Sequence, residues 1–193
     1  MDAAKLFAVI RRLKGEGLTQ AEVDEINAAL TYDDEIIVTA SAPRARTSAK
    51  GLTAMRQHEG CKLTAYPDPG SRDGHPWTIG YGATGQGITK GVVWAQEQAD
   101  QRFAADVTKR EPVLAALLGS APTTQNQWDA LMSFGYNVGM GDGGLKTSTL
   151  LRKHKEGDIA GAAKEFARWN KNDGKAMAGL TKRRAAEAAL YLS

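Results

Sequence analysis

The spacing of apolar residues divides the chain into segments of different kinds. Leu52 and Met55 lie about one helical turn apart within residues 48–59, which predicts an amphipathic helix. Gly60 follows, and a glycine just past the last helical residue is a common end signal. Residues 62–82 instead combine an alternating stretch, a turn-forming stretch with Pro and Gly, and a β-rich stretch with glycines. This pattern predicts a small hairpin or three-stranded patch.

The rest of the chain is predicted to be helical. Val93, Phe103 and Val107 mark one helix, and residues 113–118 mark a second, short one. Later apolar stretches are preceded by residues that commonly cap helices. These helix starts are Thr124 with Gln127 three residues on, Ser148 and Asp158, and a last helix covers 180–192. A small sheet followed by helices indicates the α+β class.

The first part of the chain differs from the rest. Apolar positions in 2–13 have helical spacing, and Thr19 begins a capping-box pattern, so the two segments predict a helical hairpin. A hairpin of about 30 residues is too small to hold a large core alone. Residues 41–50 lack periodicity and indicate a linker. We therefore expect an N-terminal hairpin and linker over 1–47 and a separate domain over 48–193.

Composition limits the classes of protein. The chain of 193 residues has 42% hydrophobic and 24% charged residues, which is typical of a globular protein. No apolar run approaches the roughly 20 residues that cross a bilayer, so no stable membrane insertion is expected. The start lacks the pattern of a secretory signal, so we expect the chain to be kept in the cytoplasm. Cys61 is the single cysteine and the three histidines lack metal-ligand spacing, so neither a metal nor another cofactor is expected.

Positive charge is concentrated towards the C-terminus. The whole chain carries +3, whereas residues 147–193 hold ten basic and five acidic side chains. Such a surplus favours an anionic polymer as partner, for example nucleic acid, a phosphate-bearing membrane surface or bacterial cell wall. The sequence has no helix-turn-helix, zinc-site or aromatic RNA-binding pattern, which argues against a nucleic-acid partner.

Three polar side chains around the predicted sheet can carry chemistry. Glu59 lies at the C-terminal end of the predicted helix, where the negative end of the helix dipole disfavours an ionised carboxylate. A carboxylic acid that keeps its proton near neutral pH can donate it to a leaving oxygen. Asp68 lies in a turn between two prolines and is expected to stay ionised, and Thr78 can hold a water molecule. Two carboxyl groups in such different environments are what glycoside hydrolysis requires.

Motifs in a fixed order connect these residues with a known family. In chain order they are HEG (58–60), YPD (66–68), WTIGYG (77–82), QWDALMSFGYNVG (127–139), the stretch 148–171 and GLTKRRAAEAALYL (179–192). Together they resemble the lysozyme-type endolysins of tailed bacteriophages, the family 24 glycoside hydrolases, over about residues 48–193. The resemblance implies a lysozyme-like fold in which a cleft separates a small β lobe from a larger helical lobe, here with an N-terminal helical hairpin extension.

The resemblance also implies an activity and its residues. Enzymes of this family are muramidases, which hydrolyse the β-1,4 bond between N-acetylmuramic acid and N-acetylglucosamine in peptidoglycan and so lyse the host cell. Glu59 matches the general acid, Asp68 the second carboxylate that activates or orients water, and Thr78 the residue that positions this water. Tyr136 and Thr149 match residues that line the saccharide cleft. The resemblance further implies inversion at the anomeric carbon.

Two assignments stay open within this resemblance. The spacing between Asp68 and Thr78 is longer than in the family, which makes Asp73 a rival for the second carboxylate. The YPD context and the spacing from Glu59 favour Asp68. In relatives, a basic side chain of the last helix approaches the catalytic Glu, and the three consecutive cations at 182–184 are equal candidates for this role.

Several alternatives and partners belong to the same hypothesis. A lytic transglycosylase cleaves the same bond without water, and a non-catalytic peptidoglycan-binding protein keeps the fold without the reaction; Thr78 as water holder favours hydrolysis. We expect a monomer that stays in the host cytoplasm until a membrane-permeabilising holin releases it to the periplasm and cell wall. Residues 1–30 loosely resemble segments ahead of other phage cell-wall hydrolases. The segment 1–47 is therefore either a cell-wall-binding module or an arm docked on the catalytic domain.

Overall fold

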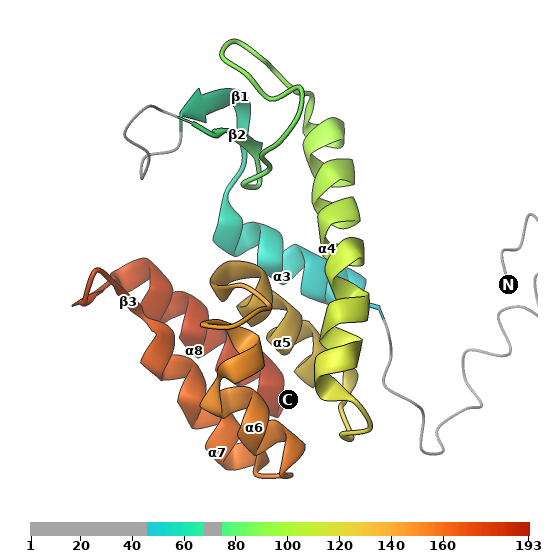
Figure 1. Cartoon of the computed structure of the whole chain (residues 1–193), viewed down its shortest axis with the longest axis vertical. Helices are drawn as coiled ribbons and strands as arrows, with labels where there is room; N and C mark the ends of the chain where they lie inside the picture. The colour runs from blue at the N-terminus through green and yellow to red at the C-terminus, as the bar shows by residue number, and fades with distance from the viewer. Residues whose placement is uncertain (1–45, 68–74) are drawn as a thin grey trace, which may run out of the picture. The chain divides into compact units, whose positions relative to one another are not determined.

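A computed structural model of the chain describes residues 46–67 and 75–193 (Figure 1). The predicted helical hairpin and linker within 1–47 fall almost wholly outside these residues, so this part of the domain organisation stays a prediction. The elements are α3 (Ala49–Glu59), β1 (Lys62–Pro67), β2 (Trp77–Gly80), α4 (Gln96–Leu118), α5 (Gln125–Val138), η1 (Leu145–Thr147), α6 (Thr149–Lys155), α7 (Ile159–Glu165), η2 (Phe166–Trp169), β3 (Lys171–Asn172), β4 (Lys175–Ala176) and α8 (Ala178–Leu192).

Helix α3 begins at a cap that is tied to the protein interior. Ser48 Oγ accepts a hydrogen bond of 3.0 Å from the Gly51 N–H. The Ser48 N–H and O–H groups both donate to the buried carboxylate of Asp129 on α5, the N–H over 3.0 Å. Gly51 leaves room for this carboxylate, because a Cβ at that position would lie 2.5 Å from Asp129 Cγ. The helix ends at Gly60, whose φ of +66° suits glycine, as predicted.

Strands β1 and β2 form an antiparallel pair within the predicted β region. Their register places Tyr66 opposite Thr78 and Pro67 opposite Trp77. A small apolar cluster supports the pair and consists of Ala65, Ile79, Ala83 and Ile88. This β lobe lies between α3 and α4 in the chain and to one side of the helices α5 to α8 (Figure 1).

Helix α4 is one helix of 23 residues where the sequence analysis predicted two, and that prediction is wrong. Val93, taken as a marker of the first helix, lies ahead of α4 and is 66% exposed. Pro112 lies inside α4 and lacks the N–H of one helical hydrogen bond, a loss of about 3 kcal/mol. The buried stripe nevertheless continues across it through Ala99, Phe103, Val107, Glu111, Leu114 and Leu118. We infer that packing of this stripe on the core outweighs the missing bond.

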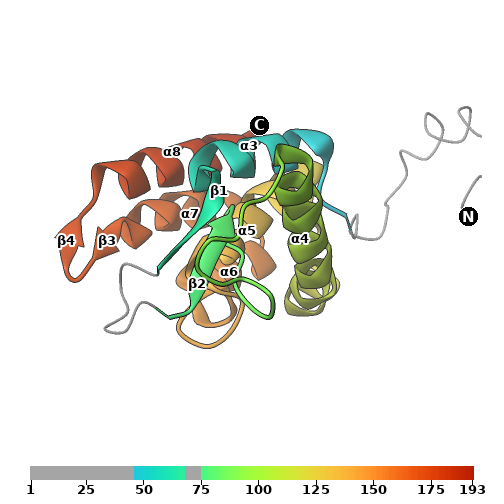
Figure 2. The same ribbon diagram turned by 90° about the horizontal axis from the view of Figure 1, so that it is seen from above.

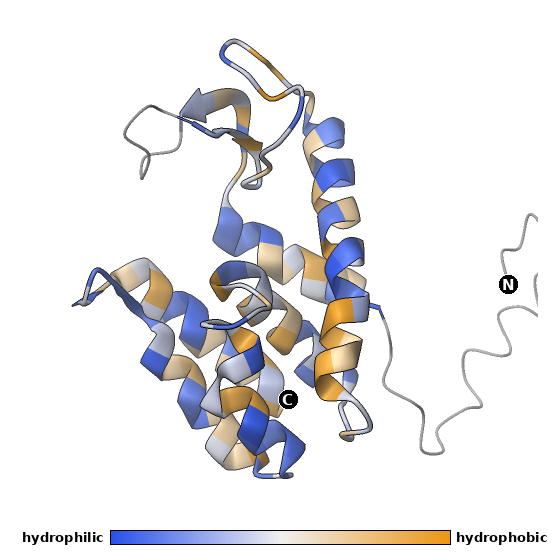
Figure 3. Cartoon of the chain, viewed as in Figure 1, coloured by the Kyte–Doolittle hydropathy of each residue, from blue (hydrophilic) through white to orange (hydrophobic). Residues whose placement is uncertain are grey.

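Helix α5 forms the centre of the helical lobe. Its residues 127–135 are all buried, because α3, α4 and α8 contact it from different sides (Figure 2). The predicted capping box is present, since Thr124 Oγ1 accepts from the Gln127 N–H over 3.2 Å and Gln127 Oε1 accepts from the Thr124 N–H over 2.9 Å. Apolar residues follow α5 and the C-terminal half of α4 (Figure 3). Phe134 meets Phe166 edge-on, with the ring centroids 5.4 Å apart.

The remaining helices cover one side of α5. Asp158 caps α7 by accepting from the Gly161 N–H, as predicted, and α7 continues into η2 with Phe166 fully buried. Helix α8 runs back along α5 and closes the lobe (Figure 1). Among the helices of 46–67 and 75–193, none has the length and apolar character needed to cross a membrane.

His154 is a buried histidine whose hydrogen bonds select a single neutral tautomer. Thr123 Oγ1 donates to the carbonyl of Ala121, so it accepts from His154 Nε2–H over 2.9 Å. His154 Nδ1 then accepts from the Tyr191 hydroxyl over 2.6 Å. A second proton on the ring would remove this acceptor, and burial lowers the pKa of His154 from its ordinary 6.5.

We expect the folded protein to lose stability as the pH falls below about 6.5 because of this residue. The folded-state pKa of His154 is depressed, so the unfolded chain binds the proton first and stability falls as the pH drops, by at most about 1.4 kcal/mol per pH unit. Thermal unfolding between pH 7.5 and 5 should show a flatter pH dependence for His154→Gln than for the parent. His75→Gln, at an exposed histidine, is the control and should keep the parental slope. Equal slopes for the parent and His154→Gln would contradict the assignment.

Candidate active site

Glu59 is placed by the end of α3 where that helix leads into the β lobe. It is the last helical residue, so its carboxyl group lies near the negative end of the helix dipole. The Glu59 side chain is 17% exposed, and Met55 one turn earlier is fully buried. The carboxyl group is therefore sheltered from bulk water and still open to a ligand from one side.

Arg183 on α8 is the cation that approaches Glu59. Its Nη2 lies 2.7 Å from Glu59 Oε1 in an ion pair, while its hydrogen bonds go to Glu187 and to the carbonyl of Ser133. This observation distinguishes between the three candidates at 182–184, because residue 182 is exposed and Arg184 contacts Glu187. The ion pair therefore places a positive charge directly beside the Glu59 carboxyl group.

Thr78 lies in β2, which pairs with β1, the strand that follows Glu59 in the chain. It pairs with Tyr66 on β1 and is 8% exposed. Asp68 and its rival Asp73 lie outside the described residues, so their roles stay predictions. Because β1 ends at Pro67, opposite Trp77, Asp68 is the first residue after the paired part of the strand.

Tyr136 and Thr149, the two residues predicted to line the saccharide cleft, have different settings. Tyr136 on α5 packs its ring against Phe103, with centroids 5.4 Å apart, and Arg110 lies over the ring at 4.6 Å. Burial raises the pKa of Tyr136 to about 12. Thr149 is the first residue of α6 and is exposed. Neither residue lines the cavity at Glu59 described next, and their predicted role is untested.

A cavity of about 690 Å³ opens beside Glu59. Its walls come from the ends of α3 and α5, from η2 and β3, and from the start of α8. Trp169 and Met177 give it apolar surface, whereas Arg168, Lys171 and Arg183 give it positive charge. The cavity therefore combines one carboxyl group with cations and an aromatic ring, a combination suited to a polar ligand that carries negative charge.

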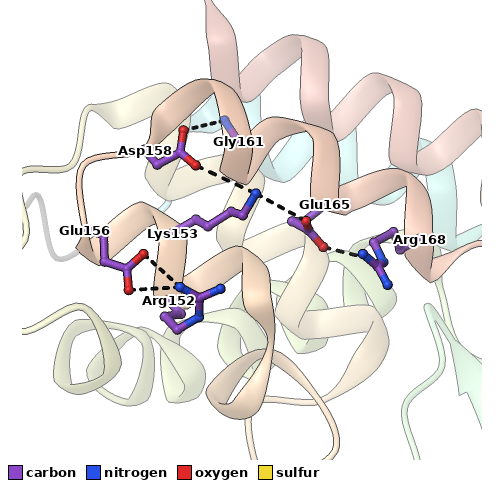
Figure 4. A network of polar contacts seen from close by, with 7 residues as sticks. All are labelled: Arg152, Lys153, Glu156, Asp158, Gly161, Glu165 and Arg168. Carbon is purple, nitrogen blue, oxygen red and sulfur yellow. Dashed lines mark hydrogen bonds and ion pairs between the residues drawn. The ribbon is translucent and has the colours of Figure 1, made fainter.

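Arg168 is connected to a network of ion pairs that joins α6 and α7 (Figure 4). Its Nε lies 3.6 Å from Glu165 Oε2, and Lys153 Nζ lies 3.4 Å from Glu165 Oε1. Lys153 also lies 3.7 Å from the carboxylate of Asp158, the cap of α7. Glu165 is only 8% exposed, so the base of the network is fixed while Arg168 itself reaches solvent.

Most of the residues that line this cavity were not predicted from the sequence. Trp169 packs edge-on against Phe134, with centroids 5.3 Å apart, and also lines the cavity. Arg168 and Lys171 were counted only in the C-terminal charge surplus. No spacing in the sequence distinguishes them from other surface cations, because the cavity forms from elements that meet only in the folded chain.

Comparison with protein families decides the relationship. The profile described as "Phage lysozyme" matches residues 56–187, which is more than half of the chain and includes Glu59 and Thr78. The chain belongs to the phage lysozyme family. This membership confirms the predicted family and makes the chain a lysozyme-type glycoside hydrolase. The segment before residue 56, with the predicted N-terminal hairpin, lies outside the match.

Individual phage lysozymes and related structures agree with this assignment. The endolysin of Acyrthosiphon pisum secondary endosymbiont phage 1 is 41% identical over 150 residues, which cover 76% of this chain and 97% of that protein. The endolysin of Bacillus phage PZA is 42% identical over 147 residues, 76% of this chain and only 55% of the longer protein.

Solved structures confirm the predicted α+β, lysozyme-like fold. An endolysin from Escherichia coli O157:H7 phage FAHEc1 has a TM-score of 0.66 and 36% identity, covering 79% of this chain and 97% of that one. The muramidase domain of SpmX from Asticaccaulis excentricus has a TM-score of 0.67 and 33% identity, covering 78% and 99%. The small β lobe and the larger helical lobe are therefore those of a phage lysozyme.

Proposed function

We propose that this phage lysozyme is a muramidase that hydrolyses the β-1,4 bond between N-acetylmuramic acid and N-acetylglucosamine in peptidoglycan. The observation that carries the proposal is the partly exposed Glu59 carboxyl group at the wall of a cationic cavity. Peptidoglycan is a polar polymer whose peptide stems carry free carboxylates, so Arg168 and Lys171 suit such a substrate.

In this mechanism Glu59 is the general acid. Its protonated carboxyl group donates the proton to the glycosidic oxygen as the bond to the anomeric carbon breaks. The carboxylate left behind lies 2.7 Å from the Arg183 guanidinium, which stabilises its new charge. Asp68 takes a proton from the attacking water. It then releases this proton to solvent, and Glu59 takes one back from solvent before the next turnover.

Asp68 and Thr78 are proposed to act on the water molecule that attacks the anomeric carbon. Asp68 accepts a proton from the attacking water, and the Thr78 hydroxyl orients that water. Thr78 lies in a paired strand and is 8% exposed, so its backbone is held in place beside β1. Attack by water on the face opposite the leaving group gives inversion, which proton NMR of the first product anomer can test.

Product analysis tests the proposed bond. Purified peptidoglycan should be digested, reduced with borohydride and examined by mass spectrometry. We expect reduced N-acetylmuramic acid at the new ends. Reduced N-acetylglucosamine would place the cut at the other glycosidic bond, and 1,6-anhydro-muramic ends would indicate a lytic transglycosylase. Binding of the polymer without any new ends would identify a non-catalytic peptidoglycan-binding protein.

We also propose host cell lysis as the biological role, with a holin giving the protein access to the wall. The support is the endolysin identity of its relatives. Bacteria that express the protein should lyse only after their inner membrane is permeabilised. Lysis without permeabilisation would remove the need for a holin. The expected monomeric state can be checked by light scattering of the full chain.

A further inference from the structure

Behind Glu59, buried charges continue into the helical lobe. Arg183 Nε donates to Glu187 Oε1 over 3.0 Å, and Arg184 Nη2 donates to the same oxygen over 2.9 Å. Arg184 Nε lies 2.7 Å from Glu187 Oε2, and Ser133 Oγ donates to Glu187 Oε1 over 2.7 Å. The exposed fractions of the side chains are 5% for Arg183, 2% for Glu187 and 0% for Arg184. We call Glu59, Arg183, Arg184 and Glu187 the charge cluster.

The inner part of the charge cluster is unbalanced. Two guanidinium groups share the single carboxylate of Glu187, so these three side chains have one positive charge in excess. Charges buried in a medium of low dielectric interact more strongly than charges in water. The excess charge therefore acts on Glu59, whose Oε1 lies 2.7 Å from Arg183 Nη2.

This imbalance bears directly on a general acid. Glu59 must keep its proton until the leaving oxygen takes it, and a nearby cation favours early loss of that proton. Glu187 contacts another nitrogen, Nε, of the same guanidinium and offsets part of its charge. The spacing of Arg183 and Glu187, four residues apart on α8, also holds the guanidinium in one direction.

We propose that Glu187 is a positioning residue for Glu59 that acts through Arg183. It fixes the direction of the guanidinium and offsets part of its charge, so that Glu59 holds its proton in the working pH range. This inference rests on the proposed role of Glu59 as general acid. The other charged or titratable groups around the cluster are His58 on α3, Lys50 near the start of α3, Asp129 and Tyr136 on α5, Arg168 on η2, Lys171 on β3 and Lys182 on α8.

Two substitutions with opposite expected effects test the proposal. Glu187→Gln removes the offsetting charge at nearly constant size, and Arg184→Met removes the second guanidinium while keeping an apolar stem. The rate of clearing of permeabilised bacteria is measured from pH 5 to 9 at constant ionic strength. The alkaline midpoint of the profile should move to lower pH by about one unit in Glu187→Gln and to higher pH by a similar amount in Arg184→Met.

Lys182→Met is the matched control, because Lys182 is an exposed cation on the same helix. Solvent and salt screen its charge, so its midpoint should stay within about 0.3 pH units of the parent. A merely structural role would slow both buried variants without opposite shifts of the midpoint. The circular dichroism spectrum and melting temperature of each variant show whether it is folded.

The outcomes separate this inference from the proposed function. If Glu59→Gln clears cells as fast as the parent, the general-acid role itself fails. If Glu59→Gln is inactive but the midpoints of the two buried variants are unmoved, or move in the same direction, only the role of Glu187 is overturned. If Glu187→Gln does not fold, Arg184→Met decides alone: a higher midpoint supports the proposal, and an unchanged or lower one overturns it.

Discussion

Replacement of Glu59 by glutamine is expected to slow the clearing of outer-membrane-permeabilised bacteria by about a thousandfold or more. Glutamine has nearly the same size, so it can occupy the same place beside Arg183, but it has no acidic proton to give. General acid catalysis contributes roughly 10² to 10⁴ in rate. Cleavage of a glycosidic bond whose leaving group is a sugar hydroxyl depends on it strongly. The initial rate of turbidity loss at equal protein concentration measures the effect.

A control for this prediction removes a carboxylate elsewhere in the same lobe. Glu156 pairs with Arg152 on the surface at 2.9 Å and lies outside the Glu59 cavity, so Glu156→Gln should clear cells at close to the parental rate. Exposed ion pairs contribute little to stability, so this variant should also melt near the parental temperature. Equal clearing by the parent and by folded Glu59→Gln would show that another feature of the protein disrupts the cells.

The second large effect is expected at the carboxylate that activates the attacking water. Asp68 and Asp73 are both candidates for this role. Asp68→Asn should lower the clearing rate by about a hundredfold or more, because asparagine cannot accept a proton from the attacking water. Asp73→Asn should stay within about threefold of the parent. The reason is the sequence context: the YPD motif and the eight residues between the glutamate and the aspartate both fit Asp68 and not Asp73.

Substituting each aspartate in turn shows which of them is the second carboxylate. Both substitutions remove one negative charge from the same short segment, so a general effect of charge on binding to the wall would appear in both. A large loss in Asp73→Asn with a small loss in Asp68→Asn would reverse the assignment. Equal and large losses would indicate that the segment acts as a whole.

Local signals in the sequence predicted much of the fold. The capping residues Thr124 and Asp158 begin helices as expected, and Gly60 ends one, because these effects depend on a few neighbouring residues. The same local reasoning failed within α4, where it predicted a separate short helix over 113–118. The buried stripe of α4 is continuous across Pro112 and joins the two segments into one helix. That stripe depends on tertiary packing.

The candidate site was predictable only in part for the same reason. The motif around Glu59 placed this residue at the end of a helix, and the structure agrees. The choice among the cations at 182–184 was beyond the sequence, because successive residues on a helix point about 100° apart and only the packing of α8 on α5 selects Arg183. Arg168 and Lys171 reach the cavity through η2 and β3, which meet α3 only after folding.

Because α3 is anchored on α5, different parts of the protein are expected to unfold locally at different rates. Amide hydrogens of α5 are shielded on every side over residues 127–135, so they should exchange with solvent only through global unfolding. The Ser48 cap binds the start of α3 to Asp129 in the middle of that protected segment. Glu59, at the far end of α3, is thus anchored to this protected segment. The β lobe has its own small apolar cluster, so we expect its amide hydrogens to exchange before those of α5.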